Sequence, residues 1–183
     1  MRGDVRQFTV DGRIVLQFCG AQASVQCPNT PDLDVRDALT IVAWVEYLPP
    51  ERPDAEYAQA VGKGYAWTLS VTPETHRPFF ECQGLQVPAT APFSRVIGQM
   101  ALNHGRWHQI AAVYDSRTLA VHLDGRLDGT QEASGLLLVD ARGVALGWSE
   151  AYETSWRGLM REVRIYDRAF SHEEVAELYD ATK

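Results

Sequence analysis

Hydrophobic and polar residues alternate in short runs along most of the chain, and the clearest such stretch is residues 107–125. In residues 107–114 apolar side chains occupy both alternating faces, which predicts a strand buried on both sides within a layered structure. A polar turn follows at Asp115–Thr118, and a second alternating run, Leu119–Leu123, ends in Asp124–Gly125, a dipeptide that favours a tight hairpin turn. The stretch therefore predicts a β-meander inside a sheet protein.

Further strands are predicted wherever apolar residues alternate with polar ones or β-branched residues cluster. They are Ile14–Phe18, Ala23–Cys27, Leu39–Tyr47, Ala66–Val71, Phe79–Gln83, Val144–Trp148 and Leu159–Tyr166. Pro49 to about Tyr57 is rich in proline and predicts a long surface loop. One helix is predicted, from a capping box of Ser171 and Glu174 to about Asp180. Many short strands and one short helix predict an all-β fold, a two-sheet antiparallel sandwich.

Three motifs, in this order, resemble the signatures of the LamG-like, concanavalin A-like jelly-roll domains. LQFCG at 16–20 is similar to the opening L-x-F-D-G, and WHQIAAVYDSRTLAVHLDG at 107–125 is similar to the central W-H-x-[aliphatic]-A-x-x-Y-D and L-x-[aliphatic]-x-[aliphatic]-D-G. GLMREVRIYDRAFS at 158–171 is similar to the closing G-x-[aliphatic]-D-E-V-R-I-Y-x-R-A-L-S. The resemblance spans nearly the whole chain and implies one domain, residues 1–183, folded as a jelly roll with laminin G-like and pentraxin-like relatives.

Composition narrows the classes of partner. The chain has 183 residues, 45% hydrophobic and 22% charged, with a net charge of −7. It is long enough for one sizeable core, and its acidity argues against nucleic acid or an anionic membrane as the main partner. No apolar run approaches the ~20 residues of a membrane span, so no membrane insertion is expected, and the N-terminal stretch lacks the apolar region of a signal peptide. The resemblance suggests an extracellular or cell-surface setting, while the sequence leaves the compartment open.

The three cysteines leave at least one thiol unpaired in a monomer. Cys19 and Cys27 flank a predicted turn and would pair in an oxidising compartment. The favoured alternative is that all three, Cys82 included, are buried thiols acting as small apolar groups.

Calcium enters through the resemblance. Members of the family often carry an aspartate in the opening motif and another in the closing motif, and such carboxylates suit a hard cation. Here Cys19 stands at the first position and Arg161 at the second. We therefore predict that this calcium site is absent and that no cofactor is needed. A calcium ion among the loop acids Asp32, Asp34 and Asp37 remains an alternative.

Catalytic patterns are not found in the sequence. Glycoside hydrolases of this fold carry paired acids on one strand face, as in E-x-D-x-x-E, and no such string occurs. The G-x-S-x-G nucleophile elbow is also missing. We therefore predict no enzyme activity, with a glycoside hydrolase as the less favoured alternative.

The best candidate for ligand binding is the segment GWSEAYETSW at 147–156, in which aromatic and acidic residues gather. Aromatic rings match the flat C–H faces of sugars, and neighbouring polar groups bond the hydroxyls. The predicted ligand-binding residues are Trp148, Glu150, Tyr152 and Trp156. The alternative is that Trp148 and Trp156 pack against the core. His76 and Arg77, in a predicted turn, are secondary candidates.

Three other residues are predicted to be structural: Trp107 in the core, His108 as a hydrogen-bonded histidine and His122 facing outward. The sequence and the resemblance together predict a non-catalytic carbohydrate-binding, lectin-like module with a glycan ligand. The alternative is a protein-interaction or structural module of the laminin G type, with a protein partner.

Overall fold

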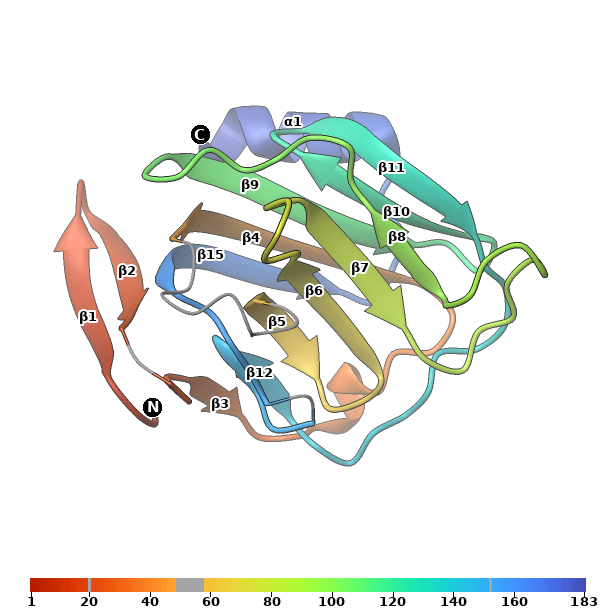
Figure 1. The fold of residues 1–183 in the computed structure, drawn as a ribbon, viewed down its shortest axis with the longest axis horizontal. Coiled ribbons are helices and arrows are strands. Elements are labelled where there is room, and N and C mark those ends of the chain that lie inside the picture. Colours follow the sequence, from red (N-terminus) through yellow and green to blue (C-terminus); the bar gives the residue numbers. More distant parts are fainter. Residues whose placement is uncertain (20, 49–57, 152) are drawn as a thin grey trace.

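The computed structural model describes residues 1–19, 21–48, 58–151 and 153–183. Two antiparallel sheets stack face to face, and α1 (His172–Thr182) covers the outside of one of them (Figure 1). The seven-stranded sheet runs in the order β1 (Val5–Val10), β2 (Arg13–Phe18), β15 (Gly158–Tyr166), β4 (Leu39–Tyr47), β9 (Trp107–Tyr114), β10 (Thr118–Leu123) and β11 (Arg126–Glu132). The six-stranded sheet runs in the order β3 (Val25–Cys27), β12 (Val144–Leu146), β5 (Ala58–Lys63), β6 (Trp67–Val71), β7 (Pro78–Cys82) and β8 (Arg95–Ile97). A short hairpin of β13 (Trp148–Ser149) and β14 (Thr154–Ser155) and a 3-10 turn at Pro31–Leu33 complete the described elements.

The main core lies between the two sheets. Alternation along β4 explains its place there: Ile41, Ala43, Val45 and Tyr47 are buried in this core, while Val42 faces the other way and packs beneath α1. A second, smaller apolar cluster therefore forms between the seven-stranded sheet and the helix. The predicted all-β sandwich is confirmed, with the helix as a partial third layer.

The C-terminal helix begins as the sequence predicts. The Ser171 hydroxyl accepts a hydrogen bond from the Glu174 amide, and the Glu174 carboxylate accepts one from the Ser171 amide. The helix ends at Thr182, beyond the predicted end near Asp180. The two additional residues are held in part by the Arg13 guanidinium, which donates to the Thr182 carbonyl at 2.8 Å.

Five of the described strands were not predicted from the pattern: β1, β5, β8, β11 and β14. β1 is almost wholly exposed, so its alternation reflects no buried face, and β5 is rich in small residues that give a weak apolar signal. The proline-rich loop predicted from Pro49 to Tyr57 lies outside the described residues.

Trp107 and His122 differ from their predicted environments. Trp107 is half-buried on the outer face of the seven-stranded sheet, where its ring centroid lies 4.9 Å from the Arg161 guanidinium carbon. His122 is 0% exposed, because α1 covers its side of β10. Pattern alone did not reveal which surface the helix covers.

The cysteines are unpaired in the structure. Cys19 and Cys27 are exposed free thiols, so the prediction that all three are buried is wrong for these two. Cys82 is buried as predicted, and burial raises the pKa of its thiol well above the ordinary value.

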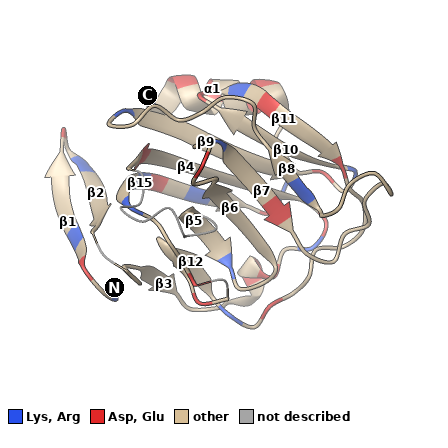
Figure 2. Ribbon diagram, in the orientation of Figure 1, with Lys and Arg blue, Asp and Glu red and all other residues tan. Residues whose placement is uncertain are grey.

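Charged residues are spread over both sheets and the helix (Figure 2). Within the described part of the chain, no helix is both long and apolar enough to cross a bilayer.

Candidate functional site

The predicted site residues fall on the β13–β14 hairpin, where Trp148 pairs with Ser155 and Ser149 with Thr154. Trp148 is half-buried and Glu150 at the turn is exposed, whereas Tyr152 lies outside the described residues. Trp156 is only 1% exposed and packs on Tyr47, with ring centroids 5.2 Å apart. The expected exposed aromatic surface therefore does not include Trp156, which serves the core. Ligand binding at Trp148 and Glu150 stays a prediction.

Beside this hairpin, the outer face of the six-stranded sheet carries polar side chains. Alternation sends Trp67, Leu69 and Phe80 into the core and the residues between them outward. Strand register then places the outward residues in a row across the sheet, in the order Gln26, Ala145, Gly62, Thr68, Glu81 and Arg95. A second outward row runs through Gln59, Ser70, Phe79 and Ile97.

Hydrogen bonds hold these polar residues in fixed orientations. The Thr68 hydroxyl donates to Gln59 Oε1 at 3.3 Å and shares a 2.8 Å bond with Ser70 Oγ. The Glu81 carboxylate accepts from Gln83 Nε2 at 2.8 Å and also from Arg95. Because these groups are largely buried and bonded, they form a rigid polar floor.

A shallow groove, which we call the sheet groove, opens at the edge of this floor. Its lining includes Gln26, Gln59, Arg142, Ser149 and Glu150. Its volume is about 20 Å³, room for little more than one water molecule, so a larger ligand would lie across its mouth and not inside it. The groove brings Glu150, from the predicted hairpin, next to the polar face of the sheet.

Tyr65 lies in the turn between β5 and β6, next to Gly64, which lines the sheet groove. It is 43% exposed, and the Arg142 guanidinium carbon lies 4.8 Å from its ring centroid. Asp140 holds both residues, since its carboxylate accepts from the Tyr65 amide at 2.9 Å and from the Arg142 guanidinium at 2.8 Å. Although burial opposes the charged form, these hydrogen bonds keep the pKa of Asp140 below its ordinary value. Asp140 is therefore an anion that fixes a stacked aromatic–cation pair beside the groove.

Sequence reasoning missed Gln59, Tyr65, Thr68, Glu81 and Arg142. For Thr68 and Glu81 a signal exists, because polar residues alternate with core residues in the predicted strands Ala66–Val71 and Phe79–Gln83. For Tyr65 and Arg142 none exists, since only the fold brings the two turns together.

The secondary candidates lie elsewhere. His76 Nδ1 and His104 Nε2 are 3.0 Å apart, and the His76 ring packs on Tyr47. Burial, reinforced by repulsion from His104, lowers the pKa of His76. Arg77 is exposed in the same turn. None of His76, Arg77 and His104 lines the sheet groove, and no third metal ligand joins the two histidines among the described residues.

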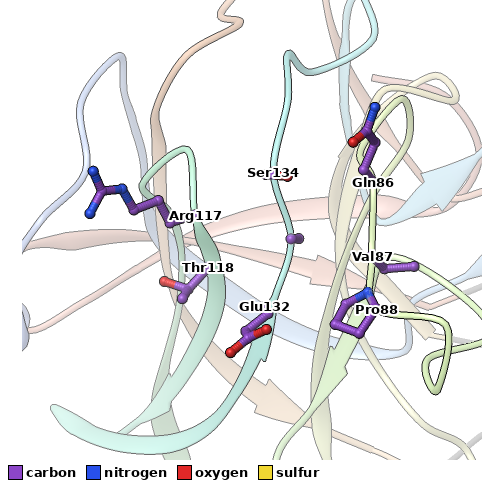
Figure 3. Close-up of a pocket in the computed structure, with 8 residues that line it drawn as sticks. Gln86, Val87, Pro88, Arg117, Thr118, Glu132 and Ser134 are labelled. Carbon is purple, nitrogen blue, oxygen red and sulfur yellow. The ribbon is translucent and has the colours of Figure 1, made fainter.

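Another hollow, of about 480 Å³, lies between the β9–β10 turn, the end of β11 and residues 86–88 (Figure 3). Its floor is backbone, where Gln86 and Ser134 exchange amide–carbonyl hydrogen bonds of 2.8 and 2.9 Å. The Arg117 and Gln86 side chains extend to opposite sides (Figure 3). The hollow thus has little convergent polar chemistry.

The two positions behind the calcium prediction do not meet. Phe18 pairs with Gly158 and Leu16 with Met160, so Cys19 and Arg161 lie roughly four residues, about 13 Å, apart along the strands. The premise that they flank one cation is therefore wrong. Asp34, one of the loop acids, instead accepts a 2.8 Å hydrogen bond from the buried Lys63 ammonium. The described residues contain no group of three or more side chains suited to hold a metal ion.

Solved structures of several proteins share this fold. Domain 4 of AbnA, a GH43 extracellular arabinanase from Geobacillus stearothermophilus, in complex with arabinotriose, matches with a TM-score of 0.69 at 17% identity, over 97% of this chain and 82% of that one. The heptameric SAP-like pentraxin from Limulus polyphemus matches with a TM-score of 0.59 at 16% identity, over 95% and 85%. The botulinum neurotoxin type G receptor binding domain matches with a TM-score of 0.72 at 13% identity. The match covers 97% of this chain but only 44% of that domain.

At these identities the likeness is one of fold. No curated protein sequence matches the chain. The family model described as the concanavalin A-like lectin/glucanases superfamily matches residues 19–176. That match covers most of the chain, and with the two stacked antiparallel sheets it shows that the chain belongs to the concanavalin A-like lectin/glucanase superfamily.

Proposed function

We propose that this chain is a non-catalytic carbohydrate-binding module and that the sheet groove is its glycan site. The observation that carries the proposal is the exposed Tyr65 ring, which contacts Arg142 of a groove that Gln26 and Glu150 also line. An aromatic ring offers a sugar an apolar face, while amide, guanidinium and carboxylate groups hydrogen-bond its hydroxyls. An open groove suits an extended glycan chain better than a small enclosed ligand.

Two further points support binding without catalysis. The similar arabinanase domain was solved in complex with arabinotriose. Hydrolysis of a glycosidic bond needs two carboxyl groups across the bond. Among the outward-facing residues of the six described strands of this sheet, Glu81 is the one carboxylate, and Gln83 and Arg95 already bond it. A binding role therefore uses the groups present better than a hydrolytic one.

The proposal is tested by affinity electrophoresis and glycan-array binding of the wild type and two groove variants, Tyr65→Ala and Glu150→Gln. Both variants should weaken polysaccharide binding about ten-fold or more, because each stacking or charged hydrogen-bonding contact contributes on the order of 1–2 kcal/mol. Phe8→Ala is the matched control, since Phe8 is an aromatic residue 38% exposed on β1. Equal retention of Tyr65→Ala and wild type would refute the assignment. Release of reducing sugar that is lost in Glu150→Gln would point to a hydrolase.

A protein-interaction module is the second candidate, and β1 is the feature that favours it. β1 has a neighbour on one side only, and Phe8 and Val10 beside its open edge are exposed. An unpaired strand with apolar side chains can accept a strand from another protein. In that case the Val10→Lys variant would no longer bind the partner protein, whereas the Tyr65→Ala variant would still bind it.

A further inference from the structure

A hollow of about 620 Å³, larger than the sheet groove and the hollow of Figure 3, lies where the C-terminal half of α1 passes over the β10–β11 turn. The segment before β9 closes its remaining side (Figure 1). We call it the helix pocket, and its polar lining consists chiefly of Asn103, Asp124, Arg126, Tyr179, Asp180 and Lys183. No residue of the helix pocket lines the sheet groove, so the two are separate places on the molecule.

One wall of the helix pocket is fixed by a hydrogen-bonded pair. The backbone N–H of Asn103 donates to His108 Nε2 at 3.1 Å. Nε2 therefore carries no proton, and the neutral ring is protonated on Nδ1. Nδ1 then donates to Asp124 Oδ2 at 2.8 Å, and the backbone N–H of Gln109 donates to Asp124 Oδ1 at 3.0 Å. Each carboxylate oxygen keeps further lone-pair capacity. Asp124 is thus a held acceptor at the pocket wall, with its orientation already set.

The opposite wall is the last turn of α1. The Tyr179 ring stacks on Trp44, with centroids 5.6 Å apart and an interplanar angle of 22°. Gly125 allows the Tyr179 side chain to lie close to the β10–β11 turn, because a Cβ atom at position 125 would lie 2.9 Å from Tyr179 Cβ. The phenol is therefore held in position, whereas the Lys183–Asp180 ion pair beside it, at 2.8 Å, is mostly exposed and weak enough to rearrange around a ligand.

The charges in the helix pocket indicate which ligand fits. Asp124 and Asp180 balance Arg126 and Lys183, so the side chains of the lining have no net formal charge. Arg126 is exposed and forms no hydrogen bond or ion pair with the described residues, so its donors are available. An anionic ligand would meet two carboxylates, and a cation would meet a guanidinium and an ammonium. A neutral molecule with many hydroxyls can use the carboxylates as acceptors and the guanidinium and amide as donors at once.

From this lining and volume we propose that the helix pocket is a second saccharide site, which binds a neutral mono- or disaccharide. Its volume lies within the range of about 300–1,000 Å³ typical of small-molecule sites. The half-exposed Met100 supplies apolar surface for the C–H faces of the ring. The site does not depend on the sheet groove, so either assignment can fail while the other holds.

The test is a titration of the whole chain with glucose, galactose, mannose, arabinose and lactose. Binding is followed by amide shifts in NMR spectra and by the indole N–H signal of Trp44, whose ring stacks on Tyr179. At least one sugar should shift the amides of residues 100–103, 124–126 and 176–183. Arg126→Ala and Asn103→Ala, both exposed positions, should each weaken that binding at least ten-fold.

Tyr65→Ala and Glu150→Gln serve as controls and should leave this binding unchanged. The proposal is overturned if none of the five sugars binds, or if binding survives in both Arg126→Ala and Asn103→Ala. Tighter binding of inorganic phosphate than of any sugar would also overturn it, because it would show an anion site. Loss of polysaccharide retention in Tyr65→Ala alone reports on the sheet groove and does not bear on this pocket.

Discussion

The indole Nε1 of Trp44 donates a 2.9 Å hydrogen bond to the hydroxyl of Thr182, and this contact ties the middle of β4 to the last turn of α1. The same hydroxyl accepts from Gln109 Nε2 at 3.2 Å and donates to the Leu178 carbonyl at 2.7 Å. Its one donor and both acceptor positions are therefore used. A single side chain near the C-terminus closes a buried polar network between the helix and the seven-stranded sheet.

Replacing Thr182 with valine should test the worth of that network. Thr182→Val keeps the shape but leaves the Trp44 indole N–H and the Gln109 amide without an acceptor. We expect the free energy of unfolding to fall by about 2 kcal/mol, the usual cost of unsatisfied buried donors. Urea denaturation measures it, and Thr182→Ser, which keeps the hydroxyl, should cost clearly less. A Thr182→Val variant as stable as the wild type would show that water replaces the hydroxyl.

Lys63 makes the second test of buried polar structure. It is 1% exposed, and its ammonium bonds Asp34 Oδ1 at 2.8 Å and the Asp140 carbonyl at 2.5 Å. Lys63→Met fills similar space but leaves the buried Asp140 carbonyl without this donor and returns the Asp34 carboxylate to water, so we expect a loss of about 2 kcal/mol in the free energy of unfolding. The hydrogen bond from Lys63 lowers the pKa of Asp34, so this contribution is present above the ordinary carboxylate pKa and fades as the pH falls below it. Thermal unfolding at pH 7 and pH 3 should therefore show a smaller difference between the variant and wild type at pH 3.

His122 should make the protein sensitive to mild acid. Burial, with repulsion from His172, lowers the pKa of His122 to about 4. The unfolded chain, with a histidine pKa of about 6.5, then binds the proton more readily than the folded one. The contribution of neutral His122 to the free energy of unfolding is thus fully present above about pH 6.5. It is lost as the pH falls toward 4, by on the order of 3 kcal/mol. Urea denaturation across this range should be flatter for His122→Gln, and parallel curves for the two proteins would count against the assignment.

Two glycines allow backbone strain to be separated from collision. Gly158 has φ +129°, and a Cβ atom there would lie 2.0 Å from the Glu46 carbonyl oxygen. Gly105 has φ +69° with no atom within 4 Å of such a Cβ. We expect Gly105→Ala to cost about 1 kcal/mol, from backbone strain alone, and Gly158→Ala about 3 kcal/mol or more. Equal melting temperatures for the two variants would contradict this difference.

Calcium should not stabilise the protein. The register separates Cys19 from Arg161, and the Asp34 carboxylate binds Lys63, so the described acids offer no cluster for the ion. An ion present at about 100 times its Kd would add roughly 2.7 kcal/mol of stability. We therefore expect the same melting temperature in 1 mM calcium and in EDTA, with magnesium as the control. A rise of several degrees specific to calcium would reverse the prediction.

The strands that form the sandwich could be predicted because their alternation is itself a consequence of burial. In β4 the residues predicted to share a face do so: Ile41, Val45 and Tyr47 lie in the core. β9 and β10 pair as the meander pattern predicts. The cap of α1 follows from two residues three positions apart, which is a local signal.

The binding surfaces were harder to predict, because they depend on contacts between distant segments. Trp156 lies in a polar stretch of sequence typical of a surface loop, yet it is buried in the core, where it packs on Tyr47 of another strand. His122 was expected outside because its strand neighbours alternate correctly, but nothing in β10 signals that α1 covers it. Tyr65 gains its place beside the sheet groove only through Arg142, from a different turn.

The open edge of β1 bears on how the protein behaves in concentrated solution. The Cys19 amide donates to the Asp4 carbonyl, so by alternation Gln7 and Thr9 point their backbone groups away from β2, whereas the Val5 amide bonds the Gly3 carbonyl. A margin of unsatisfied amides next to Phe8 and Val10 favours the slow growth of stacked aggregates at the concentrations that crystallisation and NMR require. Val10→Lys places a charge at that margin without touching either sheet interior, and is the simplest route to a monodisperse sample.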